Sequence, residues 1–383
     1  MGRHKPLFIG EIVLTAVMLC ACGGRSASAP SEWQSYDEYV RQLADRGEFS
    51  GAVFVARGGE PLLKAGYGWA DKNGGASNTP ETKFCIASLG KMFTAVAVAQ
   101  LVQNGKLSFE DTVGKYVPGF PAKISDKITV DQLLTHTSGL GDAALRPERT
   151  AGPATTTGAL LRKITKEPLQ FEPGSRFGYS NDGFIVLGAI IERITGEHYR
   201  DYLREHIFEV AGMIDTDVVG YQPRDIANMA HGYMRIDKTG RPYSRRPPVA
   251  SDDDAMPTPL RDNGDSWQIG NPSGGAYSTV GDMMNFANAL TGHKLLTPAF
   301  TDVVLAGKIK ISRPGSSLDD QYAYGFEDQK INGVRIVGHN GGTPGFEAQL
   351  DIYPDKGYAV VILANQDQVL VPAVRRSEEM LTR

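Results

Sequence analysis

The sequence predicts a mixed α/β protein in which both ends of the chain build one sheet and a helical lobe is inserted between them. Strand-like runs begin at residue 49 near the start and at residue 322 near the end, separated by Gly, Pro or Asp. Apolar segments with helical spacing lie between them. Because each kind of segment must bury an apolar face, we expect them to pack in layers around a common core.

The first elements follow a predicted leader. Residues 31–46 carry apolar side chains at helical spacing. Residues 49–71 predict a hairpin, since two apolar runs flank the turn sequence Arg-Gly-Gly-Glu at 57–60. Residues 88–104 are apolar nearly all round, which predicts a central buried helix, and Gly105 suits its C-terminal end.

The middle of the chain carries three helix signals. Thr129 and Gln132 form a capping-box pattern, residues 182–195 form an apolar helix pattern closed by a glycine, and Thr279 with Asp282 predicts another helix start. The last part predicts short strands followed by a helix. These strand-like runs cover residues 322–326, 334–339, 346–353 and 358–365, and the final helix covers 371–383.

Residues 1–21 predict a signal peptide. Arg3 and Lys5 precede an apolar run over residues 7–19, which is too short to span a bilayer as a helix. The run ends in Leu-Cys-Ala-Cys, which resembles the processing box of bacterial lipoproteins and implies that Cys22 is the lipidated first residue of the mature protein. Plain secretion or a partly inserted anchor is the alternative, because Glu11 interrupts the run.

These features predict an exported protein of the periplasm or cell envelope, held to the membrane through lipid on Cys22. Residues 22–33 then form a tether, and residues 34–383 form a single two-lobed domain. Cys85 is expected to be a small buried residue. With Cys22 lipidated no disulfide is expected in the mature chain, so stability must come from a large core.

The composition limits the partners. The chain is 41% hydrophobic and 22% charged with a formal net charge of −4, which gives no reason to expect nucleic acid. It has no phosphate-binding glycine motif, so no nucleotide is implied, and no spaced Cys-His cluster or His-Glu-x-x-His, so no metal or other cofactor is expected. The sequence leaves the oligomeric state open.

A serine and a lysine three residues apart open the apolar segment at 88–104. On a helix, Ser88 and Lys91 share a face, so the amine can reach the hydroxyl and activate it as a nucleophile without a histidine. No Gly-x-Ser-x-Gly motif occurs, which argues against a Ser-His-Asp hydrolase. The pair alone is weak evidence, because a chain of this length contains about one such match by chance.

Two further motifs supply what such a pair needs. Tyr179 can carry a proton, and Asn181 can donate a hydrogen bond to a substrate carbonyl. His339 is followed by Asn, Gly341 and Gly342 at the end of a strand-like run, where glycines let the backbone approach a ligand. The amide of Gly342 with that of the nucleophile would make a two-donor oxyanion hole.

The three motifs in this order resemble the serine β-lactamase and penicillin-binding-protein superfamily, and their spacing is similar to its class C β-lactamase branch. The resemblance covers about residues 49–366, and framework stretches at 133–140, 171–181, 272–282 and 338–346 share it. It implies the β-lactamase/transpeptidase-like fold, an antiparallel sheet flanked by helices with an all-helical lobe, and an active site between the two. It also implies a covalent acyl-enzyme on Ser88.

One departure from the family pattern bears on the substrate. His339 stands where β-lactamases have Lys, and a neutral histidine attracts a substrate carboxylate less than a lysine does. We therefore expect a peptidase or carboxypeptidase of D-amino-acid or small peptide substrates. Carboxylesterase and weak β-lactamase activity are the alternatives. A penicillin-binding or sensing module that is acylated without turnover is the non-enzyme alternative.

The sequence also predicts the character of one long loop and of one histidine. The stretch from 221 to 270 is rich in Pro and charge, and a loop of such length is usually functional or disordered. His136 lies in the framework stretch Leu-Leu-Thr-His-Thr-Ser-Gly-Leu and is expected to form local hydrogen bonds.

Overall fold

The structure is a computed structural model. It describes residues 1–2, 31–145, 156–218, 220–221, 225–236, 259–263, 268–311 and 319–383. The predicted signal peptide, Cys22 and most of the Pro-rich stretch lie outside the described residues. No helix in the described part of the chain combines the length and the apolarity that a bilayer crossing requires.

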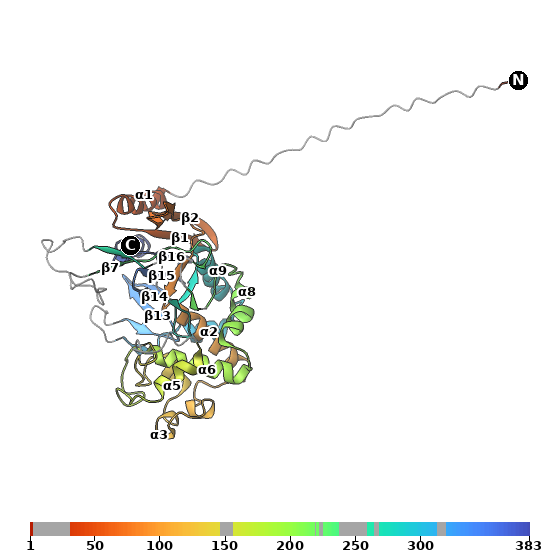
Figure 1. The fold of residues 1–383 in the computed structure, drawn as a ribbon, viewed down its shortest axis with the longest axis vertical. Coiled ribbons are helices and arrows are strands. Elements are labelled where there is room, and N and C mark those ends of the chain that lie inside the picture. The colour runs from red at the N-terminus through yellow and green to blue at the C-terminus, as the bar shows by residue number, and fades with distance from the viewer. Residues whose placement is uncertain are drawn as a thin grey trace.

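An eight-stranded antiparallel sheet forms the centre of the molecule (Figure 1). Its strand order is β11-β12-β13-β14-β15-β16-β1-β2, so the first two strands lie beside the last one. The predicted mixed α/β fold with a sheet from both ends of the chain is confirmed. The strands are β1 (Gly51–Arg57), β2 (Glu60–Tyr67), β11 (Ile309–Lys310), β12 (Gln321–Tyr322), β13 (Glu327–Ile331), β14 (Val334–Thr343), β15 (Phe346–Tyr353) and β16 (Tyr358–Ala364).

The remaining elements surround this sheet. Small two-stranded sheets pair β5 (Phe84–Ala87) with β10 (Ala276–Ser278), β3 (Trp69–Asp71) with β4 (Ala76–Ser77), β6 (Gly220–Tyr221) with β9 (Gln268–Ile269), and β7 (Tyr233–Arg235) with β8 (Leu260–Asp262). The α-helices are α1 (Ser31–Asp45), α2 (Gly90–Gln103), α3 (Ala122–Ser125), α4 (Val130–Leu134), α5 (Thr157–Ile164), α6 (Asn181–Thr195), α7 (Tyr199–Leu203), α8 (Glu209–Ala211), α9 (Val280–Thr291), α10 (Pro298–Leu305) and α11 (Leu370–Leu381). A 3₁₀ turn, η1 (Val113–Lys115), and a π turn, η2 (Arg204–Phe208), complete the described elements.

The joint between the two chain ends lies at β1 and β16. Both strands are nearly continuous apolar runs, as expected for strands covered on both faces. They pair in register from Gly51 opposite Ala364 to Arg57 opposite Tyr358. Glycine is required at position 51, since a Cβ there would collide with the Leu363 carbonyl. This joint makes the sheet continuous across both ends of the chain.

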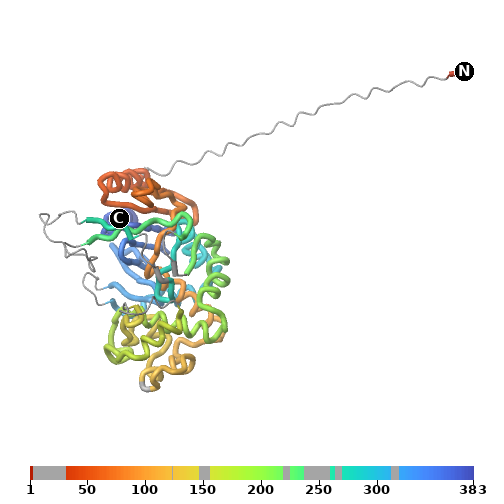
Figure 2. Tube along the Cα trace, viewed as in Figure 1, coloured from red at the N-terminus to blue at the C-terminus, as the bar shows by residue number. Residues whose placement is uncertain are grey.

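Helices cover the two faces of the sheet and bury two cores. On one face, α1 and α11 pack over residues such as Val53 and Ile362, and the Tyr36 hydroxyl donates to the Ala373 carbonyl at 3.0 Å. Figure 2 shows the first and last parts of the chain side by side here. The other face packs against α9, and α2 and α6 contribute to the same larger core. All faces of α2 are buried, as its apolar sequence predicts.

The C-terminal strands differ in extent from the sequence expectation. Of the predicted strand at 322–326, only Tyr322 lies in a strand, at the end of β12, and a turn follows it. The polar strand β13 was not predicted, because its sequence has no apolar periodicity. β14 continues through the glycines to Thr343, because β15 pairs with it up to Thr343 opposite Phe346. The His-Asn-Gly-Gly motif is therefore inside a strand and is held by ladder hydrogen bonds.

A buried carboxyl group on β15, near Glu378 of α11, makes the stability of the protein depend on pH. Desolvation raises the pKa of Asp351 to about 7, and its Oδ2 atom has no hydrogen-bond partner among the described residues. Gln349 donates to the other oxygen, Oδ1, at 2.6 Å. Because the folded pKa lies above the unfolded one, the folded protein binds the proton more tightly, and stability falls as pH rises from about 4 to about 7.

We expect Asp351→Asn to remove this loss, because an asparagine keeps the acceptor for Gln349 and carries no charge. At pH 8 the variant should be more stable than the parent by about 4 kcal/mol, because folding raises the pKa of Asp351 from 3.8 to about 7, and at pH 4 the two should be similar. Urea unfolding at both pH values measures the difference, with the exposed Asp355→Asn as control. A variant that loses as much stability as the parent between pH 4 and 8 contradicts the prediction.

Candidate active site

Ser88 lies at the junction between β5 and α2, one residue after the strand ends. The chain turns sharply there: Ala87 has a φ of 46°, in the left-handed region that non-glycine residues rarely adopt. Leu89 is the N-cap of α2, and the Lys91 amide donates to the Ser88 carbonyl at 3.0 Å. This first turn brings the serine and lysine side chains together, although Ser88 precedes the helix.

Lys91 is fully buried, and its amine has three acceptors. Its Nζ atom lies 3.2 Å from Ser88 Oγ, 2.7 Å from Asn181 Oδ1 and 2.6 Å from the Ser273 carbonyl oxygen. Burial lowers the pKa of Lys91 to about 7, against the opposing effect of Asp142. A neutral amine is therefore present at physiological pH and can accept the Ser88 proton.

The second motif is fixed by the start of α6. The Ser180 hydroxyl caps this helix by accepting from the Gly183 amide at 3.0 Å, which places Asn181 at its first position. The backbone amide of Asn181 donates to Asp142 Oδ1 at 2.7 Å. The side-chain oxygen of Asn181 accepts from Lys91. The Tyr179 ring centroid lies 4.8 Å from Lys91 Nζ. Tyr179 and Asn181 therefore both face the amine.

Glycines let three backbone segments meet around the serine. A Cβ at Gly341, on β14, would lie 3.0 Å from the Ser88 nitrogen and would collide with the Ile86 carbonyl. A Cβ at Gly274 would lie 2.5 Å from the Ala87 carbonyl oxygen. Only residues without side chains permit this approach. The third motif and the segment before β10 are thus packed directly against the serine.

A cavity of about 270 Å³ opens over Ser88. Asn181, Ser273, Gly274 and Gly342 line it, together with Cys85, Ala87, Leu145, Asn271, Gly275 and Thr343. A Cβ at Gly342 would meet no atom within 4 Å, so the space over this residue is open. The cavity has room for a small acyl group between the serine and the backbone of β14.

His339 is buried beside this site and has internal partners. Its Nε2 atom lies 2.9 Å from the Tyr322 hydroxyl, and its Nδ1 atom lies 2.5 Å from the Asn340 carbonyl oxygen. A carbonyl only accepts, so Nδ1 carries a proton, whereas the Tyr322 hydroxyl can either donate to Nε2 or accept from it. The ring does not line the cavity. Its ring centroid is 6.4 Å from that of Tyr179.

Sequence reasoning missed three contributors to the site. The Ser273 carbonyl accepts from Lys91, Asp142 accepts from the Asn181 amide, and Tyr322 binds His339. Tyr322 could not be recognised because it lies in an apolar run of the sequence. The Ser273 carbonyl could not be recognised because it belongs to the backbone. Asp142 lies two residues after the end of the framework stretch at Leu140, and this position was the only available sign.

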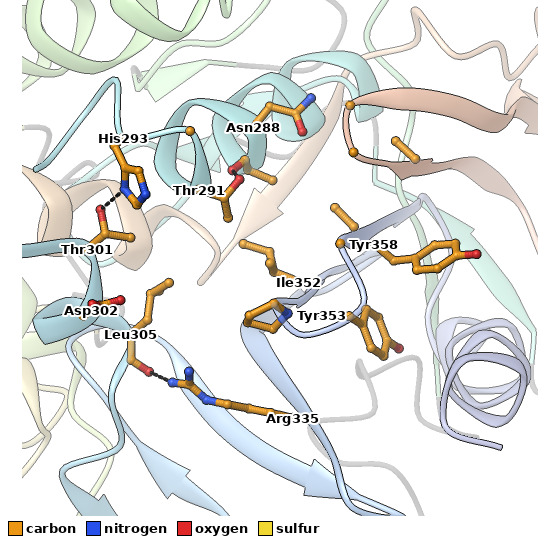
Figure 3. A pocket seen from close by; sticks show the side chains of 18 residues that line it. Asn288, Thr291, His293, Thr301, Asp302, Leu305, Arg335, Ile352, Tyr353 and Tyr358 are labelled. Atoms are coloured by element: carbon orange, nitrogen blue, oxygen red, sulfur yellow. Dashed lines mark hydrogen bonds between the residues drawn. The ribbon is translucent and has the colours of Figure 1, made fainter. Parts of the chain in front are cut away.

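Other clusters and cavities lie elsewhere. The side chains of Asp71, His231 and Asp262, and those of Glu197, Glu205 and His206, bring atoms that could hold a metal ion within 4.8 Å of one another. None of these residues lines the cavity over Ser88. A cavity of about 550 Å³ lies between α9, α10 and the ends of β14 to β16, near Leu305, Ile352 and Arg335 (Figure 3), and none of its lining residues belongs to the three motifs.

Comparisons with known proteins show the family and the fold of this chain. The family model described as Beta-lactamase matches residues 36–381. The chain is 28% identical to penicillin-binding protein 4* of Bacillus subtilis over 334 residues, 85% of this chain and 70% of that protein. A penicillin-binding protein structure from Bacillus halodurans superposes with a TM-score of 0.75 at 28% identity, covering 89% of this chain and 99% of the other.

A D-amino acid amidase from Ochrobactrum anthropi SV3, in complex with D-phenylalanine, shares the fold. The TM-score is 0.77 at 24% identity, covering 92% of this chain and 99% of that structure. The predicted β-lactamase/transpeptidase-like fold is confirmed by these matches.

We expect the reaction of Ser88 with an activated ester to accelerate as pH rises through about 7, because Lys91 must lose its proton before it can accept another. Stopped-flow measurement of the first product burst gives this rate. Lys91→Arg should slow it by about 10²- to 10⁴-fold, since a guanidinium does not deprotonate in proteins. Lys106→Arg, at an exposed position, is the control. A burst rate that does not change between pH 5 and 9 contradicts the role of Lys91 as the group that accepts the Ser88 proton.

Proposed function

Because this chain belongs to the beta-lactamase family, a superfamily of serine hydrolases, we propose that it cleaves an amide or ester bond through a covalent acyl-enzyme on Ser88. The observation that carries the proposal is the Lys91 amine. It is fully buried, lies 3.2 Å from Ser88 Oγ and has a pKa of about 7. Such an amine activates a serine at neutral pH.

The proposed first step is attack of Ser88 Oγ on the substrate carbonyl. Lys91 accepts the hydroxyl proton as the new C–O bond forms, and the amides of Ser88 and Gly342 stabilise the tetrahedral oxyanion. The proton then passes by way of Lys91 and Tyr179 to the leaving amine or alcohol, whose bond to the carbonyl carbon breaks. Water releases the acyl group in a second step, and the same two residues return the proton to Ser88.

We propose D-amino-acid amides and small peptides as the preferred substrates, ahead of carboxylic esters and β-lactams. Both ring nitrogens of His339 have internal partners and the residue does not line the cavity, so its ring is not directed at a substrate carboxylate. This geometry disfavours β-lactams, which need such a contact. The amidase that shares the fold is the reason to test D-amino-acid amides first.

A hydrolysis panel with D- and L-phenylalanine p-nitroanilide, p-nitrophenyl acetate and nitrocefin tests the proposal. We expect steady turnover, with a higher kcat/KM on the D-anilide than on the L-anilide, the ester or nitrocefin, and at least a 10³-fold loss in Ser88→Ala. Ser175→Ala, at an exposed serine, should keep the parent rate. Turnover that survives in Ser88→Ala contradicts the mechanism, whereas a stoichiometric burst without turnover supports the alternative of an acylated sensing module.

We also propose that the protein is exported and held to the membrane through lipid on Cys22, as its N-terminal sequence predicts. In a bacterial host fed an alkyne fatty acid, the parent chain should be labelled and sediment with membranes. Cys22→Ala should lose the label, and Cys20→Ala should keep it, since alanine is usual at that position of the processing box. Equal labelling of both variants would refute the assignment of Cys22.

A further inference from the structure

His136 is a fully buried residue with an unusual backbone, in the loop that follows α4. Its φ is 58°, in the left-handed region that only a few per cent of non-glycine residues adopt, with Asn, Asp and His the most frequent among them. A residue keeps such a conformation only when its surroundings hold it there. The contacts of both its backbone and its ring show what holds it.

His136 binds the residues on both sides of Tyr179. The Gly178 amide donates to the His136 carbonyl at 2.8 Å, and the Ser180 amide donates to His136 Nδ1 at 3.1 Å. The segment before α6 is therefore fixed at two points by one residue. Ser180 is also the N-cap of α6, so the second of these bonds sets the start of the helix that carries Asn181.

The imidazole ring also packs against Tyr179 itself. Its centroid lies 4.2 Å from that of Tyr179, with 36° between the ring planes, and 4.6 Å from that of Tyr322. Phe184, on α6, lies 5.1 Å away on the same measure. Tyr322 in turn binds His339, so the His136 ring lies between the second and third motifs of the site.

The proton on His136 is placed by these bonds. Nδ1 accepts from the Ser180 amide, so the neutral ring carries its proton on Nε2. Burial, with Lys91 and His339 nearby, holds the pKa of His136 well below its usual value. Nε2 is buried without a hydrogen-bond partner in the part of the chain that the structure describes. A buried N–H without a hydrogen-bond partner destabilises the folded protein. Packing alone would not require a histidine at this position.

We propose that His136 is a positioning residue of the acyl-transfer site, which fixes Tyr179 and the start of α6 against Lys91. The proposal rests on the proposed function, and it names a residue that touches neither the serine nor the cavity. His136 acts through two bonds that bracket Tyr179 and through a ring that packs on Tyr179, whose own ring covers the buried amine.

Two variants separate these contributions. His136→Asn suits the left-handed backbone, and its Oδ1 atom replaces Nδ1 as acceptor for Ser180, but it has no ring. His136→Phe keeps the ring and loses the acceptor. His293→Asn is the matched control, because His293 also has a φ of 58° and binds Thr301 beside the remote cavity.

With p-nitrophenyl acetate we expect kcat to fall at least tenfold in His136→Phe and at least threefold in His136→Asn, with KM within twofold of the parent. His293→Asn should keep the parent kcat. In His136→Asn the rise of kcat/KM with pH should move to higher pH, because water admitted beside Lys91 weakens the desolvation that lowers its pKa. Asp142 and Tyr179, the other titratable groups facing the amine, are unchanged in this variant.

Parent values of kcat and of the pH profile in folded His136→Asn overturn the proposal, whether or not His136→Phe folds. Folding is checked by circular dichroism. An equal loss of kcat in His293→Asn also overturns it, because the effect would then come from backbone strain alone. Ser88→Ala distinguishes the two levels: turnover in that variant refutes the proposed function, whereas an inactive Ser88→Ala with fully active His136 variants refutes only the positioning role.

Discussion

The burial of the Lys91 amine is the constraint on which the site depends. A charged ammonium is strongly disfavoured away from water, so a buried lysine is either paired with a carboxylate or loses its proton. Here the three acceptors are a hydroxyl, an amide oxygen and a backbone carbonyl, and none carries a full negative charge. They hold the amine in place without stabilising its charged form as a carboxylate would. The apolar α2 helix excludes water from one side, and the start of α6 closes the other.

Close approach of backbones around the serine is the second requirement, and it follows from the sheet. β14 can pass against the β5–α2 junction only because Gly341 and Gly274 have no side chains. The ladder with β15 holds the glycines of β14 in place, and its hydrogen bonds offset the conformational entropy lost when glycines are ordered. The sheet thus makes the backbone rigid at Gly341 and Gly342, where the sequence allows the greatest conformational freedom. A preorganised oxyanion hole needs this rigidity.

Much of the fold could be predicted from the sequence, because its signals are local. The apolar periodicity of α2 and α6, the caps at Thr129 and Thr279, and the alternating runs near the C-terminus all depend on neighbours in the chain. β13 was missed because its strand character comes from pairing with β14, not from its own polar sequence.

The candidate site divides in the same way between what the sequence reveals and what only folding creates. Ser88, Lys91, Tyr179 and Asn181 carry side chains whose chemistry is visible in a sequence, and the structure brings them together. The Ser273 carbonyl could not be predicted, since every residue has one. The partners of His339 could not be predicted either, because Tyr322 is distant in sequence and only the sheet places the two together.

The pairing of β1 with β16 has a consequence for how the protein is made. Gly51 pairs with Ala364 on β16, so β1 has only β2 as a neighbour, on its other edge, until nearly the whole chain has been synthesised. The backbone that completes the surroundings of Ser88 also arrives late, with β14. The nucleophile is therefore translated early and remains unassembled until the end. A truncated chain that lacks the last strands would carry Ser88 and Lys91 without the environment that makes them reactive. Such a topology is slow to close, since distant segments must meet before either is stabilised.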